Sequence, residues 1–389
     1  MNAYRHRLVF AAACVGMLVF GIVLTTLGAV LPSIIQRHGL DRTEAGSLLA
    51  LMSLGILAGS LVFGPVVDRR GYKGMLAAAV VLIALGLEGI AFAPSIALLA
   101  ASAITIGFGG GLINGGTTAL VADISAEGRA AGLAYLGVFF GIGAFGVPLV
   151  LGLLREQFGD AGIVAVIGAL VALVLAYYAA VRFPEPKQPQ GFPLRQAAVL
   201  LRDPVLVLLG LTLFFESGME ITVGGWTATY VSQELGLSPE RALYLLSLYW
   251  LGMTGARLVS GWLLKRVSTV AVLLSSLGVA FAGALILIGA RTTASAGAGT
   301  LLAGAGFAAV FPVILGYVGD RYERLSGTAF GVVLVMALMG GTALPYVTGV
   351  LGDAFGLRLS LAIVPAGLVC VALIFGIARP RLRRPPEVG

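Results

Sequence analysis

The sequence predicts an all-α integral membrane protein with twelve transmembrane helices in two pseudo-symmetric bundles of six. Three observations lead to this fold class: the composition, the number of long apolar segments, and a repeat that relates the two halves of the chain. Hydrophobic residues make up 59% of the 389 residues, charged residues make up 11%, and the mean hydropathy is +1.01. A soluble globular chain carries about 25% charged residues, so this composition excludes a water-soluble protein.

The spans follow from the length that a helix needs to cross a bilayer, about 20 mainly apolar residues. The first predicted span is too long for a secretory signal, and no small-residue cleavage site follows it, so we expect it to be retained. Cutting the first half of the chain at charges, prolines and polar turns predicts spans over 8–35, 44–67, 74–93, 96–122, 129–153 and 161–182. The second half is predicted to span the membrane at 204–231, 240–264, 269–290, 295–318, 326–351 and 358–378.

Twelve spans place both termini on the same side of the membrane, and the basic residues indicate which side. The termini and the loops on their side hold 18 Lys and Arg residues, the opposite loops hold six, and Arg257 lies inside a span. Because cytoplasmic loops carry an excess of Lys and Arg, we expect a multi-pass protein of the inner cell membrane with cytoplasmic termini. The same bias accounts for the net charge of +7 without a nucleic-acid partner.

The two halves are predicted to be separate bundles joined by a linker. Residues 183–203 are the only long polar stretch and are rich in Pro and Gln, which is typical of a connecting segment. We therefore expect an N-terminal bundle over 1–182, a cytoplasmic linker over 183–203, and a C-terminal bundle with a short basic tail over 204–389.

The halves also repeat at an offset of 197 residues. Landmarks from the second span to the fifth coincide at this offset: Gly64 with Gly261, Gly107 with Gly304, Gly109 with Gly306, Asp123 with Asp320, Pro148 with Pro345, and Phe158-Gly159 with Phe355-Gly356. Six spans return the chain to its starting side, so the copies have the same orientation. Parallel six-helix repeats are the architecture of one class of transporter, in which the substrate binds near the midplane between the halves.

The loop between the second and third predicted spans carries an ordered motif, Gly64-Pro-Val-Val-Asp68-Arg69-Arg-Gly71-Tyr72-Lys73. It resembles the signature loop of the major facilitator superfamily, which runs Gly, three residues, Asp, Arg, one residue, Gly, Arg, and Lys or Arg. Only Tyr72 departs from this pattern. Asp68 can cap a helix end or pair with a base, and Gly71 allows a tight turn. The resemblance implies the superfamily fold and a gate formed by Asp68, Arg69, Gly71 and Lys73.

Further gate residues are expected where the fourth and tenth spans end. Asp123 and Asp320 occupy equivalent positions there, near Arg129 and Arg324 respectively. We interpret these four residues as gating or capping residues rather than as substrate ligands. The second copy of the signature loop has Lys265 in place of the aspartate.

The seventh span carries a second motif, with Gly218, Glu220, Gly225, Trp226 and Tyr230 at set spacings. It resembles the seventh span of the fucose-permease-like sugar:cation symporter branch of the superfamily, which has Gly-x-Glu, then Gly-Trp, then Tyr. Three shorter stretches agree with that branch, and they are Trp250-x-Gly252-x-x-x-Ala256-Arg257, Asn114 after a glycine run, and Phe139-Phe140-Gly141-Ile-Gly143-Ala.

These residue types suit a sugar. Carboxylates and carboxamides can bridge neighbouring hydroxyls, and the rings of Trp and Tyr offer flat faces to the C–H side of a pyranose. The predicted substrate-binding residues are Asn114, Glu220, Trp226, Tyr230, Tyr249 and Trp250. An alternative is that Trp226 and Tyr230 belong to an aromatic belt at the membrane interface.

Glu216 and Glu220 are the predicted coupling residues. They lie four residues apart, on one face of a helix, and two acids within a span are costly unless they have a function. Crowded carboxylates in a low dielectric bind protons more tightly, as a proton carrier requires. The alternative is that one of them only neutralises Arg257. Glu88, late in the third span, is expected to reach toward the outer surface instead.

Together these observations predict a secondary transporter that takes up a sugar or similar polar molecule with a proton or sodium ion, acting as a monomer by alternating access. The alternative on the same fold is a drug or metabolite efflux antiporter. A receptor that does not transport is less favoured, because no soluble signalling domain is present. The acids lack a His or Cys constellation, so neither an enzyme nor a metal site is expected, and the coupling ion takes the place of a cofactor.

Overall fold

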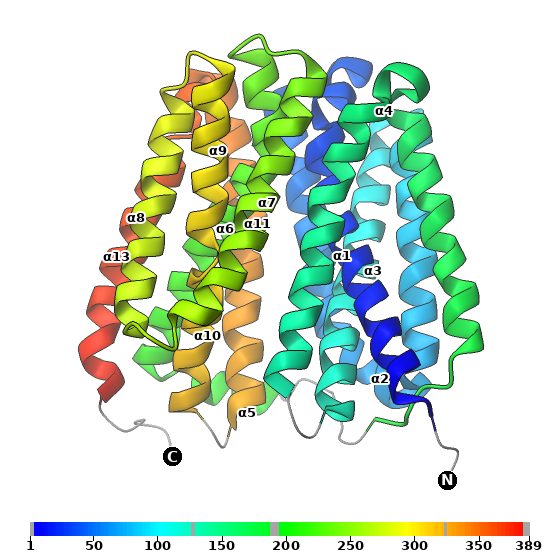
Figure 1. Cartoon of the computed structure of the whole chain (residues 1–389), viewed down its shortest axis with the longest axis vertical. Coiled ribbons are helices and arrows are strands. Elements are labelled where there is room, and N and C mark those ends of the chain that lie inside the picture. Colours follow the sequence, from blue (N-terminus) through cyan, green and yellow to red (C-terminus); the bar gives the residue numbers. More distant parts are fainter. Residues whose placement is uncertain (1–3, 126–128, 187–193, 323–324, 384–389) are drawn as a thin grey trace. The chain divides into compact units, whose positions relative to one another are not determined.

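The computed structural model describes residues 4–125, 129–186, 194–322 and 325–383, and its regular structure there is entirely helical (Figure 1). The described chain divides into two units. Unit 1 comprises residues 1–40 and 51–192, and unit 2 comprises residues 41–50 and 193–389. The division falls in the predicted linker, and the first turns of the second span group with unit 2.

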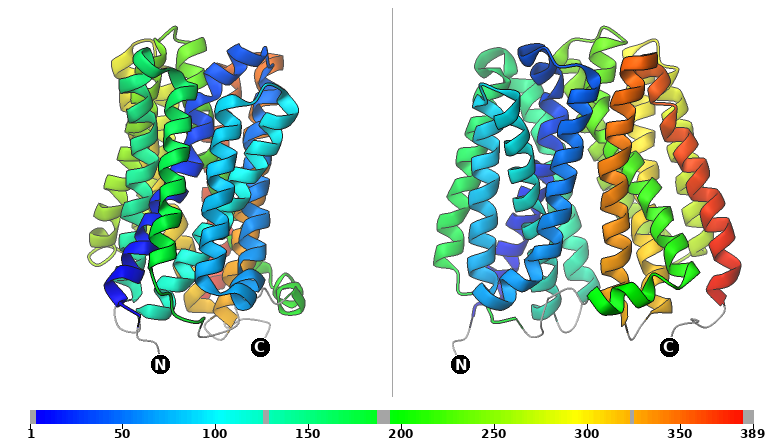
Figure 2. Two further views of the ribbon diagram at one scale, coloured as in Figure 1. Left: turned by 90° about the vertical axis from the view of Figure 1, so that its right-hand side faces the viewer. Right: turned by 180° about the vertical axis from the view of Figure 1, so that it is seen from behind.

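Unit 1 is built from four long helices, two of which turn back on themselves. They are α1 (His6–His38), α2 (Arg42–Phe92), α3 (Ile96–Ile124) and α4 (Arg129–Ala180). At 1.5 Å per residue, 51 residues of straight helix would extend for about 76 Å, far more than the bilayer core of about 30 Å. Gly71 in α2 (φ 67°) and Gly159 in α4 (φ 66°) take left-handed conformations and divide each helix into two antiparallel arms (Figure 2). Unit 1 therefore supplies six spans.

Unit 2 supplies six further spans. Its helices are α5 (Leu194–Leu200), α6 (Pro204–Gln233), α7 (Pro239–Leu263), α8 (Thr269–Ile288), α9 (Thr293–Phe307), α10 (Val310–Arg321), α11 (Ser326–Phe355), α12 (Leu357–Ser360) and α13 (Ile363–Ala378), followed by a 3-10 helix (Arg379–Arg383). α9 and α10 form one span, 293–321, interrupted where Pro312 lacks the N–H for a helical bond. α12 and α13 form another, 357–382. Ten segments of the described chain are long and apolar enough to cross a membrane, and the two folded helices raise the number of spans to the predicted twelve.

Side chains at the helix starts explain several boundaries. Ser95, Ser268 and Thr292 each cap the helix that follows by accepting a backbone N–H. Asp203 does the same for α6, whose first residue is Pro204. The sequence-based boundaries lie within a few residues of these caps in most spans, because the caps are local signals.

Helix contacts reproduce the repeat that the sequence predicts. A Cβ atom on Gly107 of α3 would collide with the carbonyl oxygen of Met52, and one on Gly304 of α9 would collide with that of Tyr249. The two glycines are 197 residues apart, and so are the two residues that they contact. Each unit therefore packs its second and fourth spans through the same small-residue contact, as is common for helices in membranes.

We name the two ends of each unit by its first membrane-spanning helix. The inner end is where α1 begins in unit 1 and where α6 begins in unit 2, and the charge bias predicts that it is cytoplasmic. The outer end is where these two helices finish, at His38 and Gln233.

Candidate functional site

The two acids of α6 differ in their surroundings although they lie one turn apart. The side chain of Glu216 is fully buried, at 0% exposure, while Glu220 is half-buried. Oε2 of Glu216 accepts a hydrogen bond from the Ser217 hydroxyl (3.3 Å). Among the described residues no group donates to its Oε1. A buried carboxylate with an unsatisfied oxygen is costly when ionised, so this position favours a bound proton or cation.

Helix α7 provides the polar groups beside this pair. Tyr249 is fully buried and donates its hydroxyl to the backbone carbonyl of Glu220 (3.1 Å). The positive charge of Arg257 is close enough to act on both carboxyl groups. The site therefore holds two acids, one base and a phenol within unit 2. The alternative in which Arg257 neutralises one of the acids is compatible with this arrangement.

Aromatic rings of α7 pack directly on α6. The rings of Tyr249 and Trp250 lie edge to face, with centroids 5.1 Å apart and planes at 78°. A Cβ atom on Gly224 would lie 3.1 Å from the Trp250 ring, so the glycine lets the two helices approach. The structure thus brings three predicted residues together: Glu220, Tyr249 and Trp250.

Trp226 and Tyr230 of α6 also lie inside unit 2, and both rings are fully buried. Nε1 of Trp226 donates to the carbonyl of Pro345 in α11 (3.0 Å), and the Tyr230 hydroxyl donates to the carbonyl of Ile288 in α8 (3.0 Å). Their burial argues against the aromatic-belt alternative, because such a belt faces lipid. Their contact with a substrate stays a prediction.

Asn114 belongs to unit 1, where it is half-buried on α3. The Thr117 hydroxyl donates to the backbone carbonyl of Asn114 (3.3 Å). Its role as a substrate ligand also stays a prediction.

The signature loop lies at the inner end of unit 1. Asp68 and Arg69 are exposed, and Gly71 forms the turn between the two arms of α2. Nζ of Lys73 donates to the carbonyl of Ala179 at the end of α4 (2.5 Å). The gating role that the resemblance implies for these residues stays a prediction.

Asp123 is bonded to the residue that departs from the superfamily pattern. The buried Tyr72 donates its hydroxyl to Oδ2 of Asp123 (2.6 Å), so a neutral donor stands where the pattern has an arginine. Asp320, the repeat partner of Asp123, is exposed at the end of α10. Of the other two predicted gate residues, Arg324 lies outside the described residues, as does the side chain of Arg129.

An ion pair at the inner end of unit 2 was not predicted from the sequence. Asp203 is fully buried; its Oδ2 accepts from the Tyr322 hydroxyl (2.7 Å) and lies 3.6 Å from Nη2 of Arg321, whose side chain is 5% exposed. Burial and the bond to Asp203 both raise the pKa of Tyr322 above its ordinary value, so this hydroxyl remains a donor at neutral pH. The Asp-Pro pair was a signal for the helix start, but nothing local indicated its partners.

A second unpredicted cluster lies at the outer end of unit 2. Asp353 of α11 accepts the backbone N–H groups of Arg42 (3.0 Å) and Thr43 (2.8 Å), and also the Thr43 hydroxyl (2.6 Å). The Arg42 guanidinium reaches the carbonyl of Gly352 (2.6 Å) and the carboxylate of Glu234 (3.3 Å). A carboxylate from another helix therefore caps the N-terminus of α2, which explains why residues 41–50 group with unit 2.

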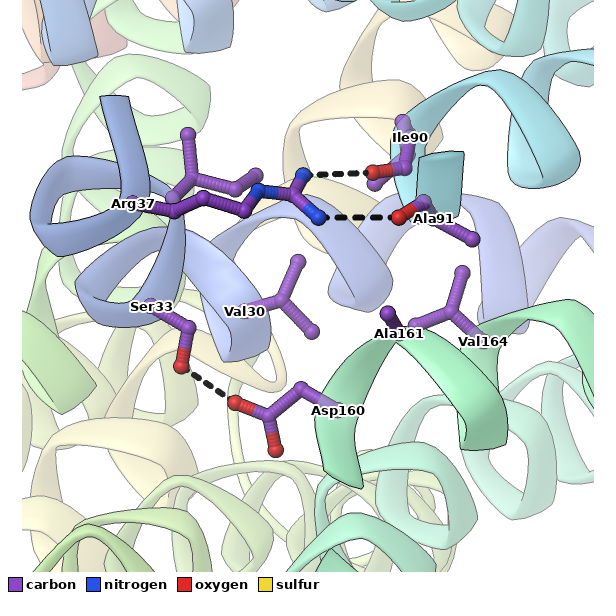
Figure 3. Close-up of a pocket in the computed structure, with 9 residues that line it drawn as sticks. Val30, Ser33, Arg37, Ile90, Ala91, Asp160, Ala161 and Val164 are labelled. Carbon is purple, nitrogen blue, oxygen red and sulfur yellow. Dashed lines mark hydrogen bonds between the residues drawn. The ribbon is translucent and has the colours of Figure 1, made fainter. Parts of the chain in front are cut away.

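A cavity of about 200 Å³ lies at the outer end of unit 1 (Figure 3). Figure 3 shows the Arg37 guanidinium donating to the carbonyls of Ile90 and Ala91, and Ser33 donating to Asp160. None of the residues predicted to bind substrate or coupling ion lines this cavity. It is lined by Val30, Ser33, Ile34, Arg37, Ile90, Ala91, Asp160, Ala161 and Val164.

Comparison with known proteins identifies relatives over most of the chain. Residues 13–336 match the family model described as Major Facilitator Superfamily. The uncharacterized MFS-type transporter YfkL of Bacillus subtilis is 23% identical over 87% of both chains. Sodium-dependent glucose transporter 1A of Mus musculus is 22% identical over 85% of this chain and 86% of its own. The crystal structure of a D-xylose-proton symporter has the same fold, with a TM-score of 0.77, 17% identity, and coverage of 95% of this chain and 97% of the symporter.

Proposed function

This chain belongs to the Major Facilitator Superfamily and is a transporter rather than an enzyme, and we propose that it couples a cation to the uptake of a sugar or similar polar molecule. In this proposal the substrate and a proton or sodium ion bind together and cross by alternating access. The single observation that carries it is the pair of acids in α6, Glu216 and Glu220, inside a membrane span.

The two acids differ in their access to solvent. Glu216 is sealed from solvent and has one oxygen without a donor among the described residues, whereas Glu220 is half-buried. A carrier needs a group whose occupancy changes as the site opens to each side. Glu220 meets that requirement, and Glu216, if ionised one turn away, strengthens cation binding there.

The sugar assignment rests on the groups around Glu220. A carboxylate, a phenol and a pair of aromatic rings packed edge to face are a set of groups that binds polyhydroxylated rings. The names of two similar proteins support this class, since one is a sodium-dependent glucose transporter and the other a D-xylose-proton symporter. Those names differ in the coupling ion, so both ions need to be tested.

The test is transport by the purified protein in sealed proteoliposomes. A panel of radiolabelled hexoses, pentoses and polyols is offered under an inward proton gradient, an inward sodium gradient, an outward gradient of either ion, or no gradient. We expect at least one sugar to accumulate above its external concentration under one of the two gradients only. Accumulation of no sugar under either gradient would refute the proposal, and accumulation under an outward cation gradient would support the efflux antiporter instead.

A further inference from the structure

The two repeat-related loops at the inner ends of the units differ in how their basic residues are used. In unit 1 the loop contains Asp68, and its neighbours bond within the unit: Lys73 to the carbonyl of Ala179 and Tyr72 to Asp123. In unit 2 the corresponding stretch joins α7 to α8 and reads Gly261-Trp-Leu-Leu-Lys-Arg-Val-Ser268, without an acid. Its bases therefore lack the local counter-charge that the unit 1 loop possesses.

The side chains of Lys265 and Arg266 are both exposed. In the parts of unit 2 that the structure describes, neither side chain makes an ion pair or a hydrogen bond. The Arg266 guanidinium instead lies over the Trp262 ring, 4.4 Å from its centroid. This cation–π contact uses the flat face of the guanidinium, so the N–H groups at the edge of the guanidinium remain available to donate hydrogen bonds.

Trp262 itself is 53% exposed, whereas the other two tryptophans, Trp226 and Trp250, are buried. It follows the exposed Leu258 and Val259 on α7, so an apolar strip leads along the helix to the basic loop. Tryptophan favours the level of the lipid headgroups, where its ring can be partly apolar and partly hydrated. The strip therefore offers a surface for acyl chains, and it ends at two basic side chains.

We propose that this loop is a binding site for an anionic phospholipid, whose phosphate pairs with Arg266 and Lys265 and whose acyl chain packs on Trp262. Charge complementarity selects this occupant. The two bases have no acidic partner on the loop, and the phosphate of a membrane lipid is the anion available at the end of a spanning helix. Guanidinium groups bind phosphate through paired N–H donors, and Lys265 adds a second positive charge.

The exposed tryptophan provides a direct measurement. The purified protein is reconstituted in phosphatidylcholine containing a small fraction of either brominated phosphatidylglycerol or brominated phosphatidylcholine, and tryptophan fluorescence is recorded. We expect stronger quenching by the brominated anionic lipid. W262F should remove the difference, because the remaining tryptophans are buried away from lipid. Circular dichroism of W262F checks that the helices are retained.

Variants of the bases test the selectivity. Each basic side chain near an anionic surface contributes about a fivefold preference for anionic over neutral lipid. R266Q should therefore weaken the preference for phosphatidylglycerol about fivefold, and K265Q/R266Q should weaken it roughly 25-fold. R291Q is the matched control, because Arg291 is exposed at the outer end of the following helix. Equal quenching by the two lipids would overturn the proposal. The proposal would also be overturned if K265Q/R266Q kept the preference for the anionic lipid, or if R291Q lost as much of that preference. Displacement of the lipid by millimolar inorganic phosphate would overturn it too.

Discussion

Helices α1 and α6 are the equivalent first membrane-spanning helices of the two units, and they differ in the side chains at matching positions. At the offset of 197 residues, Gly21 of α1 corresponds to Gly218 of α6, and both approach a neighbouring helix too closely for a Cβ atom. The packing surface is therefore shared. The helices differ at another pair of positions, where α6 has Glu216 and Glu220 and α1 has the buried Val19 and Val23.

The polar groups of the two helices are also satisfied differently. In α1 the hydroxyls of Thr25 and Thr26 donate to the carbonyls of their own helix, at 3.0 Å and 2.7 Å. Within the described residues, Oε1 of Glu216 in α6 has no donor. Polar groups bonded to their own helix contribute little beyond structure, whereas a buried acid that the helix cannot satisfy calls for a cation. This difference is why we propose that the cation binds at the acids of unit 2.

The largest effect on transport is expected from neutralising Glu220, which is a valine at the matching position of α1. E220Q mimics the protonated acid and should abolish accumulation of substrate against its gradient, reducing the ratio of internal to external substrate to about one. Exchange of substrate across the membrane should survive, because exchange does not require the cation to leave. Proteoliposome uptake in proton and sodium gradients, with counterflow as the second readout, measures both.

E88Q is the matched control, since Glu88 is also an acid within a span but lies in unit 1. It should accumulate substrate normally. If E220Q still concentrates substrate at the wild-type rate in either ion, Glu220 is not the coupling residue.

A smaller effect tests whether both units contribute to substrate binding. N114A removes a carboxamide from unit 1 and W226A removes a ring from unit 2. Loss of a polar partner typically costs about 1–3 kcal/mol, so each variant should bind the transported sugar about tenfold to a hundredfold more weakly. Isothermal titration of the purified protein measures this. Unchanged affinity in both variants would place the substrate elsewhere.

Each unit has a polar contact at its inner end, and the two contacts can be compared by their effect on stability. They are the Asp203–Arg321 ion pair in unit 2 and the Asp123–Tyr72 hydrogen bond in unit 1. D203N leaves the buried charge of Arg321 without its counter-ion, which should cost about 3–5 kcal/mol. D123N still presents a carbonyl oxygen to the Tyr72 hydroxyl and should cost only about 1 kcal/mol. Thermal unfolding in detergent should therefore show a much larger fall in Tm for D203N. Equal shifts would mean that the ion pair adds nothing beyond a hydrogen bond.

The smallest effect is expected at Asp68 in the signature loop of unit 1, because the corresponding loop of unit 2 has no acid. D68N should slow transport severalfold while leaving substrate affinity measurable, because Asp68 is exposed and distant in sequence from the predicted ligands. Initial rates and binding measured on the same preparation separate the two quantities. A variant that transports at the normal rate would remove Asp68 from the gate.

The sequence alone was sufficient to predict the membrane spans, the repeat and the position of the two acids within α6. Hydropathy is a property of each residue and its neighbours in the chain, so it predicts a helix such as α1 from residues 8–35 without knowledge of its partners. The repeat fixed equivalent positions, and the contacts of Gly107 and Gly304 confirm them. It did not fix equivalent surroundings, since Asp123 bonds to Tyr72 whereas Asp320 is exposed.

Only the tertiary structure decided which polar groups meet. Asp203 and Tyr322 are far apart in the chain, and their hydrogen bond depends on how the starts and ends of several helices pack. Asp353 caps the first turn of α2 for the same reason, and the Trp226 ring is held by a backbone carbonyl that no motif indicates. In lipid every backbone polar group needs a partner within the protein, and a buried polar side chain is costly without one. The sequence therefore determined where such groups lie along each helix, and helix packing in three dimensions determined the partner that each one found.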